Sequence, residues 1–337
     1  MAPSATETIT LEHSPVKLIS NVGPYKELAP IGYEKDIEEQ GKDRMGSQPP
    51  RLVSKATYKN YLPRWDINET YPTLELFEHR DHGLDAELTY PDLWQTGVTT
   101  NHLTPTIGTE VSGIQLTERK FVAFRDQDFA DLPIDEALDY VCYFGKLHIH
   151  PTSGAPAGYP EVHLVHRGAG DKTHEQFFQT RTGSVAWHSD VPYEKQPLGT
   201  TFLYILDVPE SGGDTLFSNQ VEAYNRLSDG FKERLHGLKA THSGVEQVNA
   251  SRGNNGAARR EPVVSEHPIV RTNPVTGEKA LYVNPQFTRS IVGYKQEESD
   301  VLVTSHSALV DWKTGQRRHL ARIAPQAEPL KETPFKA

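Results

Sequence analysis

The chain has 337 residues and a formal net charge of −10, with 45 acidic against 35 Lys and Arg residues. This balance argues against a nucleic-acid partner bound through many phosphate contacts. No run approaches the roughly 18 apolar residues of a transmembrane helix, and the first residues lack the basic and apolar regions of a secretory signal. Cys142 is the single cysteine, which excludes an intrachain disulfide. We therefore expect a cytoplasmic protein without a membrane partner.

Three regions follow from composition. Residues 1–50 are rich in Pro, Glu, Lys and Gly and predict a partly ordered N-terminal tail. Residues 51–102 carry enough aromatic side chains to pack as an arm on the core, and residues 103–330 are expected to form the main domain. The arm could cover its own core or a partner subunit, so the sequence allows a homo-oligomer.

The first elements of the main domain are a strand and a helix. Lys120–Phe124 is apolar and short, as in a buried strand. In residues 132–144, apolar side chains recur at spacings of four and three, with Asp135 and Glu136 early, which predicts a helix. A second helix is expected over residues 221–238.

Short apolar runs separated by turn residues fill most of the chain after Gly145. They predict strands at residues 161–165, 185–191, 200–206, 215–217, 268–271, 280–283, 301–304 and 319–323. A helix followed by many short strands is typical of a mainly β fold with flanking helices, here a double-stranded β-helix or jelly roll.

His188 and Asp190 are the most informative pair. Two residues apart on a strand, they would face the same way, and an imidazole with a carboxylate forms two thirds of the facial triad that holds non-haem Fe(II). The pattern also occurs at His79-Arg80-Asp81, but that copy lies in a charged run beside a glycine, which we interpret as a solvated loop. The apolar neighbours of His188 favour it as the metal ligand.

The third ligand should come from a distant strand. The candidates are His236, His242, His267, His306 and His319. His306 is preferred because it follows the predicted strand 301–304 and precedes an arginine cluster. Arg318 and Arg322 in that cluster would share one face of a strand, and arginine suits bidentate recognition of carboxylate or sulfonate groups. The residues alone fit a surface basic cluster equally well.

Several segments together resemble the taurine/α-ketoglutarate dioxygenase family, and most closely its fungal sulfonate dioxygenase branch. The resemblance covers about residues 105–325, and the motifs occur in the family's order. The segments are Phe144-Gly-Lys-Leu-His-Ile-His-Pro151, Trp187-His-Ser-Asp-Val191, Gly212-Gly-Asp-Thr-Leu216, Val283-Asn-Pro-Gln-Phe287 and Gln316-Arg-Arg-His-Leu-Ala-Arg322.

This resemblance implies an Fe(II)- and 2-oxoglutarate-dependent dioxygenase that consumes O2 and hydroxylates a small sulfonate, releasing sulfite and an aldehyde. It assigns His188, Asp190 and His306 to the metal and to catalysis. It assigns Thr215 and Arg318 to the distal carboxylate of 2-oxoglutarate. It assigns His150, Val191 and Arg322 to the anionic substrate, although His150 without the family would be read as an ordinary strand histidine.

Three alternatives stay open. Ser153 and Ser184 stand where taurine-specific enzymes have residues for the amine end, so we do not expect strict taurine specificity. The same chemistry could act on a carboxylate or a sulfate ester, since His150 and Arg322 would bind either anion. The chain could also be an inactive jelly-roll relative, because the stretches before Lys120 and before His306 are shorter than the family's pattern.

Overall fold

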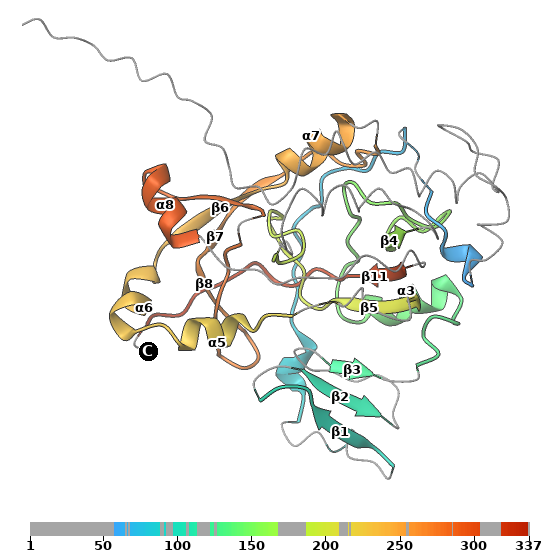
Figure 1. The fold of residues 1–337 in the computed structure, drawn as a ribbon, viewed down its shortest axis with the longest axis horizontal. Coiled ribbons are helices and arrows are strands. Elements are labelled where there is room, and N and C mark those ends of the chain that lie inside the picture. The colour runs from blue at the N-terminus through green and yellow to red at the C-terminus, as the bar shows by residue number, and fades with distance from the viewer. Residues whose placement is uncertain are drawn as a thin grey trace, which may run out of the picture.

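A computed structural model describes residues 57–64, 66, 68–87, 91, 97–105, 108–112, 122–124, 127–167, 187–208, 215, 217–253, 256–284, 286–303 and 318–335. Within these residues the strands form three sheets of three strands and one of two. Helices lie around them (Figure 1), which confirms the expected mainly β fold with flanking helices. None of the described helices is long and apolar enough to cross a membrane.

One sheet carries residues from three distant parts of the chain. Its strands are β4 (His163–Arg167), β11 (Arg318–Ile323) and β5 (Phe202–Asp207), in the order β4-β11-β5. Both pairings are antiparallel, and Arg322 lies opposite His163 on one side and Leu203 on the other. The strands expected at residues 161–165, 200–206 and 319–323 are confirmed, with small shifts at their ends.

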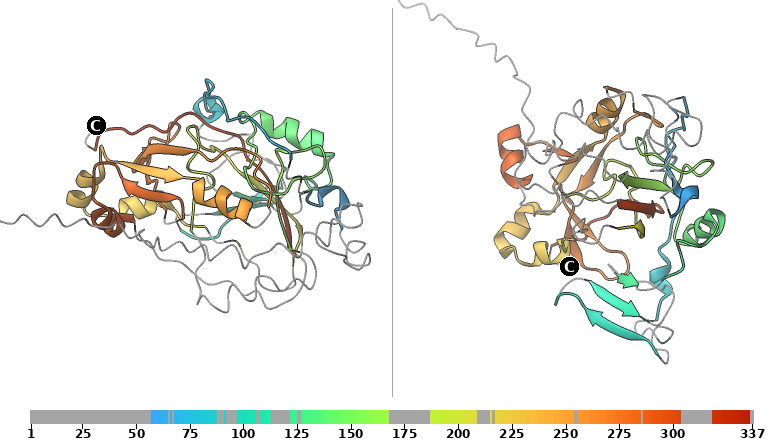
Figure 2. Two further views of the ribbon diagram at one scale, coloured as in Figure 1. Left: turned by 90° about the horizontal axis from the view of Figure 1, so that it is seen from above. Right: turned by 45° about the vertical axis from the view of Figure 1, so that its right-hand side comes forward.

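The two faces of this sheet have different neighbours. Helix α3 (Ile134–Cys142) packs its buried Ile134, Ala137 and Val141 into a core that includes Leu164 and Ile323 of the sheet. In both views of Figure 2, α3 lies at the edge of the molecule beside the sheet. Successive residues of a strand point to opposite faces, so His163 and Arg322 face away from this core.

A second sheet lies beside the first and carries helices at its far end (Figure 1). Its order is β10-β6-β7, and it packs with neighbouring helices around a second core. The elements are α5 (Gln220–Asn225), α6 (Asp229–Leu235), β6 (Lys239–Ser243), α7 (Val245–Gly253), β7 (Val264–Pro268), β8 (Val270–Thr272), β9 (Lys279–Leu281), β10 (Thr288–Ile291) and α8 (Gln296–Val303). Strands β8 and β9 pair with each other.

The remaining elements precede α3. A third sheet, β1-β2-β3, contains Thr99–His102, Thr109–Ser112 and Val122–Phe124, so the strand expected at 120–124 is confirmed over its last residues. Two 3-10 helices, η3 (Lys59–Tyr61) and η4 (His82–Asp85), lie in the region expected to form an arm. The division into tail, arm and domain stays a prediction.

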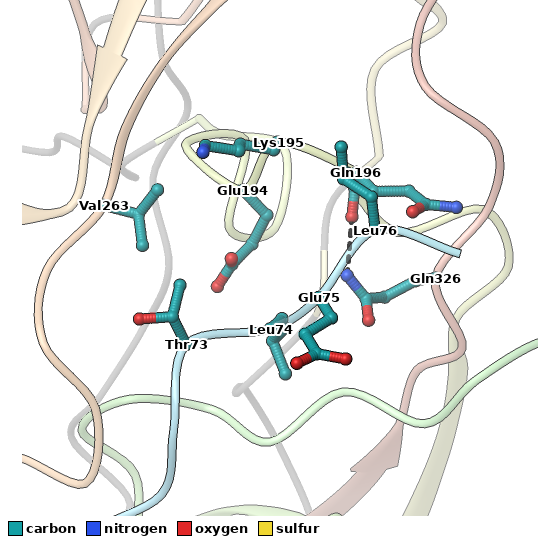
Figure 3. A pocket seen from close by; sticks show the side chains of 9 residues that line it. All are labelled: Thr73, Leu74, Glu75, Leu76, Glu194, Lys195, Gln196, Val263 and Gln326. Carbon is teal, nitrogen blue, oxygen red and sulfur yellow. Dashed lines mark hydrogen bonds between the residues drawn. The ribbon is translucent and has the colours of Figure 1, made fainter.

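Residues 71–81 form a segment without regular secondary structure, whose side chains are exposed or partly buried. The buried Gln196 holds this segment, because its side chain donates to the Phe77 carbonyl and accepts the Phe77 N–H, each over 3.1 Å. Gln326 Nε2 donates to the Gln196 carbonyl over 2.8 Å. Figure 3 shows the small pocket where this segment meets Glu194, Gln196 and Gln326.

The predictions of three strands were wrong. Residues 301–303 end helix α8, whose first turn holds Glu297 and Glu298, as the positive end of a helix dipole favours. The described residues 187–191 around His188 have no strand structure and bend at Asp190 and Val191, and neither Thr215 nor Phe217 lies in a strand. The single helix expected at 221–238 is two helices, α5 and α6, interrupted where Ser228 takes an extended conformation before α6.

Candidate functional site

His188 and Asp190 meet although they do not lie on a strand. His188 Nε2 is 3.4 Å from Asp190 Oδ1, and the two side chains are 39% and 29% exposed. Donors at this separation can reach one ion, since bonds to first-row metals from nitrogen and oxygen are about 2.1 Å long. An imidazole nitrogen with a carboxylate oxygen is a donor pair that suits Fe(II). These two residues therefore fit the metal that the sequence suggests.

A strained turn holds this pair. Val191, directly after Asp190, has a φ of 40°, a left-handed conformation that costs a β-branched residue about 1–3 kcal/mol. Its buried side chain packs with Tyr193 and Phe287. The ring of Phe287 also meets the His188 ring edge to face, with centroids 6.1 Å apart. Packing thus offsets the strain and keeps the carboxylate beside the imidazole.

Arg322 reaches the same carboxylate from strand β11. Its Nη1 lies 2.5 Å from Asp190 Oδ2, and its Nη2 donates to His163 Nδ1 over 3.2 Å. Burial alone would raise the pKa of Asp190, but the charge of Arg322 and the contact with His188 outweigh it and hold the pKa well below its usual range. Asp190 is therefore an anion with one oxygen toward His188 and the other toward Arg322.

His150 adds a neutral donor. Its Nδ1 accepts the backbone N–H groups of Thr152 and Ser153, over 3.2 and 3.0 Å. Burial above all, and then the neighbouring His163 and Arg322, hold the pKa of His150 well below its ordinary value. A neutral imidazole that accepts at Nδ1 carries its proton on Nε2. His150 is therefore able to donate to an anion, and its ring stands perpendicular to that of His163 at 4.4 Å.

A buried ion pair supports this arrangement. Arg260 Nη2 lies 2.5 Å from Glu194 Oε1, and His148 Nε2 is 3.1 Å from the same oxygen. Arg260 Nε donates to the carbonyl of Ile149 over 2.9 Å. The pair thus ties the segment that carries His150 to the turn that follows Asp190.

Sequence reasoning missed both His163 and Arg260. His163 lies on a predicted strand, but its pairing with Arg322 is seen only in the structure. Arg260 follows Arg259 in the sequence, and both side chains are buried although arginines are mostly exposed. The second copy of the histidine pattern is structural: His79 Nε2 is 3.8 Å from Glu328, and Asp81 accepts from the Gly83 N–H at the start of η4.

The other predicted site residues are placed in part. Thr215 is exposed in the connection between β5 and α5. Arg318 begins β11, opposite Arg167 and in the same strand as Arg322. His306 and Ser184 lie outside the described residues. Within the described ranges no three His, Cys, Asp or Glu side chains gather around a common point. Of the three predicted metal ligands, the structure brings His188 and Asp190 together, and their role as ligands stays a prediction.

Comparisons with known proteins show to which family the chain belongs. Residues 95–319 match the family described as "Taurine catabolism dioxygenase TauD, TfdA family". An alpha-ketoglutarate-dependent sulfonate dioxygenase of Saccharomyces cerevisiae is 36% identical over 332 residues, covering 83% of this chain and 81% of the yeast protein. The alpha-ketoglutarate-dependent dioxygenase cnsP of Penicillium expansum is 35% identical, covering 80% of this chain and 86% of its own. An alpha-ketoglutarate-dependent sulfate ester dioxygenase of Pseudomonas putida is 26% identical, covering 58% of this chain and 69% of its own.

The yeast alignment also bears on the short stretches of this chain. The alignment is 332 residues long, but it covers only 83% of the 337 residues of this chain. It therefore includes positions at which the yeast protein has a residue and this chain has none. The yeast protein therefore carries internal segments that this chain lacks.

Solved structures share the fold. A taurine dioxygenase from Burkholderia xenovorans superposes with a TM-score of 0.50 at 22% identity, covering 70% of this chain and 97% of its own. Another structure from that bacterium has a TM-score of 0.51 at 25% identity and covers 71% of this chain. The expected jelly roll is thus confirmed. The chain belongs to the taurine catabolism dioxygenase TauD, TfdA family.

Proposed function

We propose that this protein is an Fe(II)- and 2-oxoglutarate-dependent dioxygenase that hydroxylates a small organic sulfonate and releases sulfite and an aldehyde. One observation carries the proposal: Asp190 lies between a histidine that can bind a metal and an arginine that can bind an anion. The substrate class rests on this arginine and on the similarity to the yeast sulfonate dioxygenase.

We take the roles of the residues from the motifs that this chain shares with its family. His188, Asp190 and His306 would hold the iron, and Thr215 and Arg318 would hold the distal carboxylate of 2-oxoglutarate. Bound iron and 2-oxoglutarate supply the activation of O2, while the protein supplies position and charge. His150, Arg322 and the turn at Val191 would bind the sulfonate.

Arg322 determines where the anion lies. Because its guanidinium contacts Asp190 directly, an anion on the same guanidinium lies beside the metal ligands. The C–H bonds nearest to the sulfonate are then those next to the metal. Hydroxylation of that carbon gives a product that separates into an aldehyde and sulfite.

The test is sulfite release with matched formation of succinate from 2-oxoglutarate, measured over a panel of alkyl sulfonates that includes taurine. We expect turnover on several sulfonates, its loss in His188→Ala, and its retention in His79→Ala, which removes the histidine of the structural His-x-Asp copy. Activity on taurine alone would contradict the predicted breadth. Absence of sulfite and succinate in the wild type would favour an inactive relative with shortened internal segments.

A sulfate ester is the second candidate substrate, favoured by the similarity to the Pseudomonas putida sulfate ester dioxygenase. A sulfate ester presents the same anionic oxygens to Arg322 and His150. Inorganic sulfate as the coproduct identifies this reaction, and glyoxylate would identify an aryloxyalkanoate substrate. We further propose a cytoplasmic enzyme without a nucleic-acid or membrane partner, and the sequence allows a homo-oligomer.

A further inference from the structure

His163 is the closest neighbour of the anion-binding arginine that has no role so far. It lies directly opposite Arg322 in the pairing of β4 with β11, so the two side chains leave the sheet on the same face. Arg322 Nη2 donates to its Nδ1 over 3.2 Å. The His163 ring also stands edge to face against His150, with centroids 4.4 Å apart. His163 thus touches both side chains that are proposed to bind the substrate.

The charge state of His163 suits this place. Burial first, and then the charge of Arg322, hold the pKa of His163 well below its ordinary value, so the ring is a neutral acceptor. A neutral acceptor fixes the planar guanidinium without cancelling its charge. A carboxylate in the same place would be a second negative charge beside Arg322, in addition to Asp190, and would weaken the attraction for an incoming anion.

Arg322 still has an unused donor. Its side chain is 8% exposed, and its Nε has no hydrogen-bond partner among the described residues. A buried N–H without an acceptor is costly, and an acceptor supplied by a ligand would remove that cost. His163 and Asp190 each contact one outer nitrogen, and neither contacts the Nε–H, which remains a donor for an anionic ligand.

We propose that His163 is a positioning residue that orients the Arg322 guanidinium and so sets the affinity of the site for its small organic anion. The inference rests on the proposed function, because it takes Arg322 as the substrate-binding arginine. It adds a residue that determines anion affinity and that lies on a strand outside the sequence motifs.

Three substitutions separate this role from a purely structural one. His163→Leu removes the acceptor at similar size, His163→Asn restores an acceptor near the position of Nδ1, and His163→Asp restores it with a negative charge. His102→Leu is the matched control, since His102 is an exposed strand histidine whose Nδ1 also has a partner, Thr109 Oγ1 at 3.3 Å. Calorimetry of ethanesulfonate binding to protein loaded with iron and 2-oxoglutarate gives Kd, and steady-state assays give KM and kcat.

His163→Leu should weaken binding and raise KM for the sulfonate about tenfold or more, as loss of an acceptor by a charged donor implies. The KM for 2-oxoglutarate and the melting temperature should stay near wild type. The His163→Asn variant should recover most of the affinity for the sulfonate, and the His163→Asp variant should bind it more weakly than the His163→Leu variant. Unchanged affinity in Leu, an Asn variant no better than Leu, or an equal rise of both KM values would overturn the proposal.

Failure of the proposed function can be told apart from failure of the proposed role of His163. If the wild type acts on a sulfate ester or a carboxylate and not on sulfonates, the sulfite assay rejects the sulfonate substrate, and the same variants measured on the accepted anion decide the role of His163. If the wild type binds none of these anions in the calorimeter, the role of His163 is rejected as well.

Discussion

Replacing Arg260 by leucine should destabilise the protein strongly. The Arg260 and Glu194 side chains are 1% and 3% exposed and lie 2.5 Å apart. Removing Arg260 leaves the Glu194 carboxylate buried with only His148 beside it, and the loss of one partner of a buried ion pair costs about 3–5 kcal/mol in free energy of unfolding. The substitution also frees the carbonyl of Ile149, next to His150, so we expect a higher KM for the anionic substrate as well.

The chain offers a matched control in Arg226 and Glu222, whose side chains are 77% and 30% exposed. This pair spans one helical turn and is worth about 0.3–0.5 kcal/mol, so Arg226→Leu should change stability little. Urea unfolding at pH 7, followed by tryptophan fluorescence, measures both variants. Adding Glu194→Gln to Arg260→Leu removes both charges and should recover part of the loss. The reasoning is refuted if Arg260→Leu costs no more than Arg226→Leu.

Three further predictions concern pH, backbone and substrate binding. Burial lowers the pKa of His242 from 6.5 to about 3, so below pH 6.5 the unfolded chain binds a proton that the folded chain does not. The free energy of unfolding should fall from pH 6.5 toward pH 3, by about 1.4 kcal/mol per pH unit from this residue. In His242→Phe, the midpoint of urea unfolding should therefore depend less on pH than in the wild type. Gly145→Ala should lower the melting temperature far more than Gly158→Ala, because both have positive φ but only at Gly145 would a Cβ collide with the Gln326 carbonyl. Arg322→Lys keeps the charge but loses the planar donors, and steady-state kinetics should show KM for the anion rising at least about tenfold, whereas an unchanged KM would argue against Arg322 as the substrate ligand.

Strand periodicity predicted the individual strands of the sheet that carries the site. It paired no strands, yet it placed β4, β5 and β11 and put Arg318 and Arg322 on one face, because alternation depends only on local backbone geometry. The same reasoning was wrong at the described residues 301–303, where apolar residues end a helix whose first turn holds acidic residues. A short apolar run fits either element, and the helix start was the better guide.

The site itself was only partly predictable. His188 and Asp190 meet as expected, although through a strained turn at Val191 that no pattern of residues predicts. The buried contacts of Arg260 with Glu194, and of His163 with Arg322, join residues far apart in the chain. Such partners depend on tertiary packing, so these residues looked ordinary in the sequence.

The measurement that bears most directly on the proposed enzyme is an anaerobic titration of Fe(II) and 2-oxoglutarate, followed by visible absorption. The account predicts an absorption band in the wild type that saturates at equimolar iron, persists in His79→Ala, and disappears in His188→Ala and His306→Ala. A wild-type protein that shows no band at saturating iron and 2-oxoglutarate, or a band that His188→Ala leaves unchanged, would contradict it.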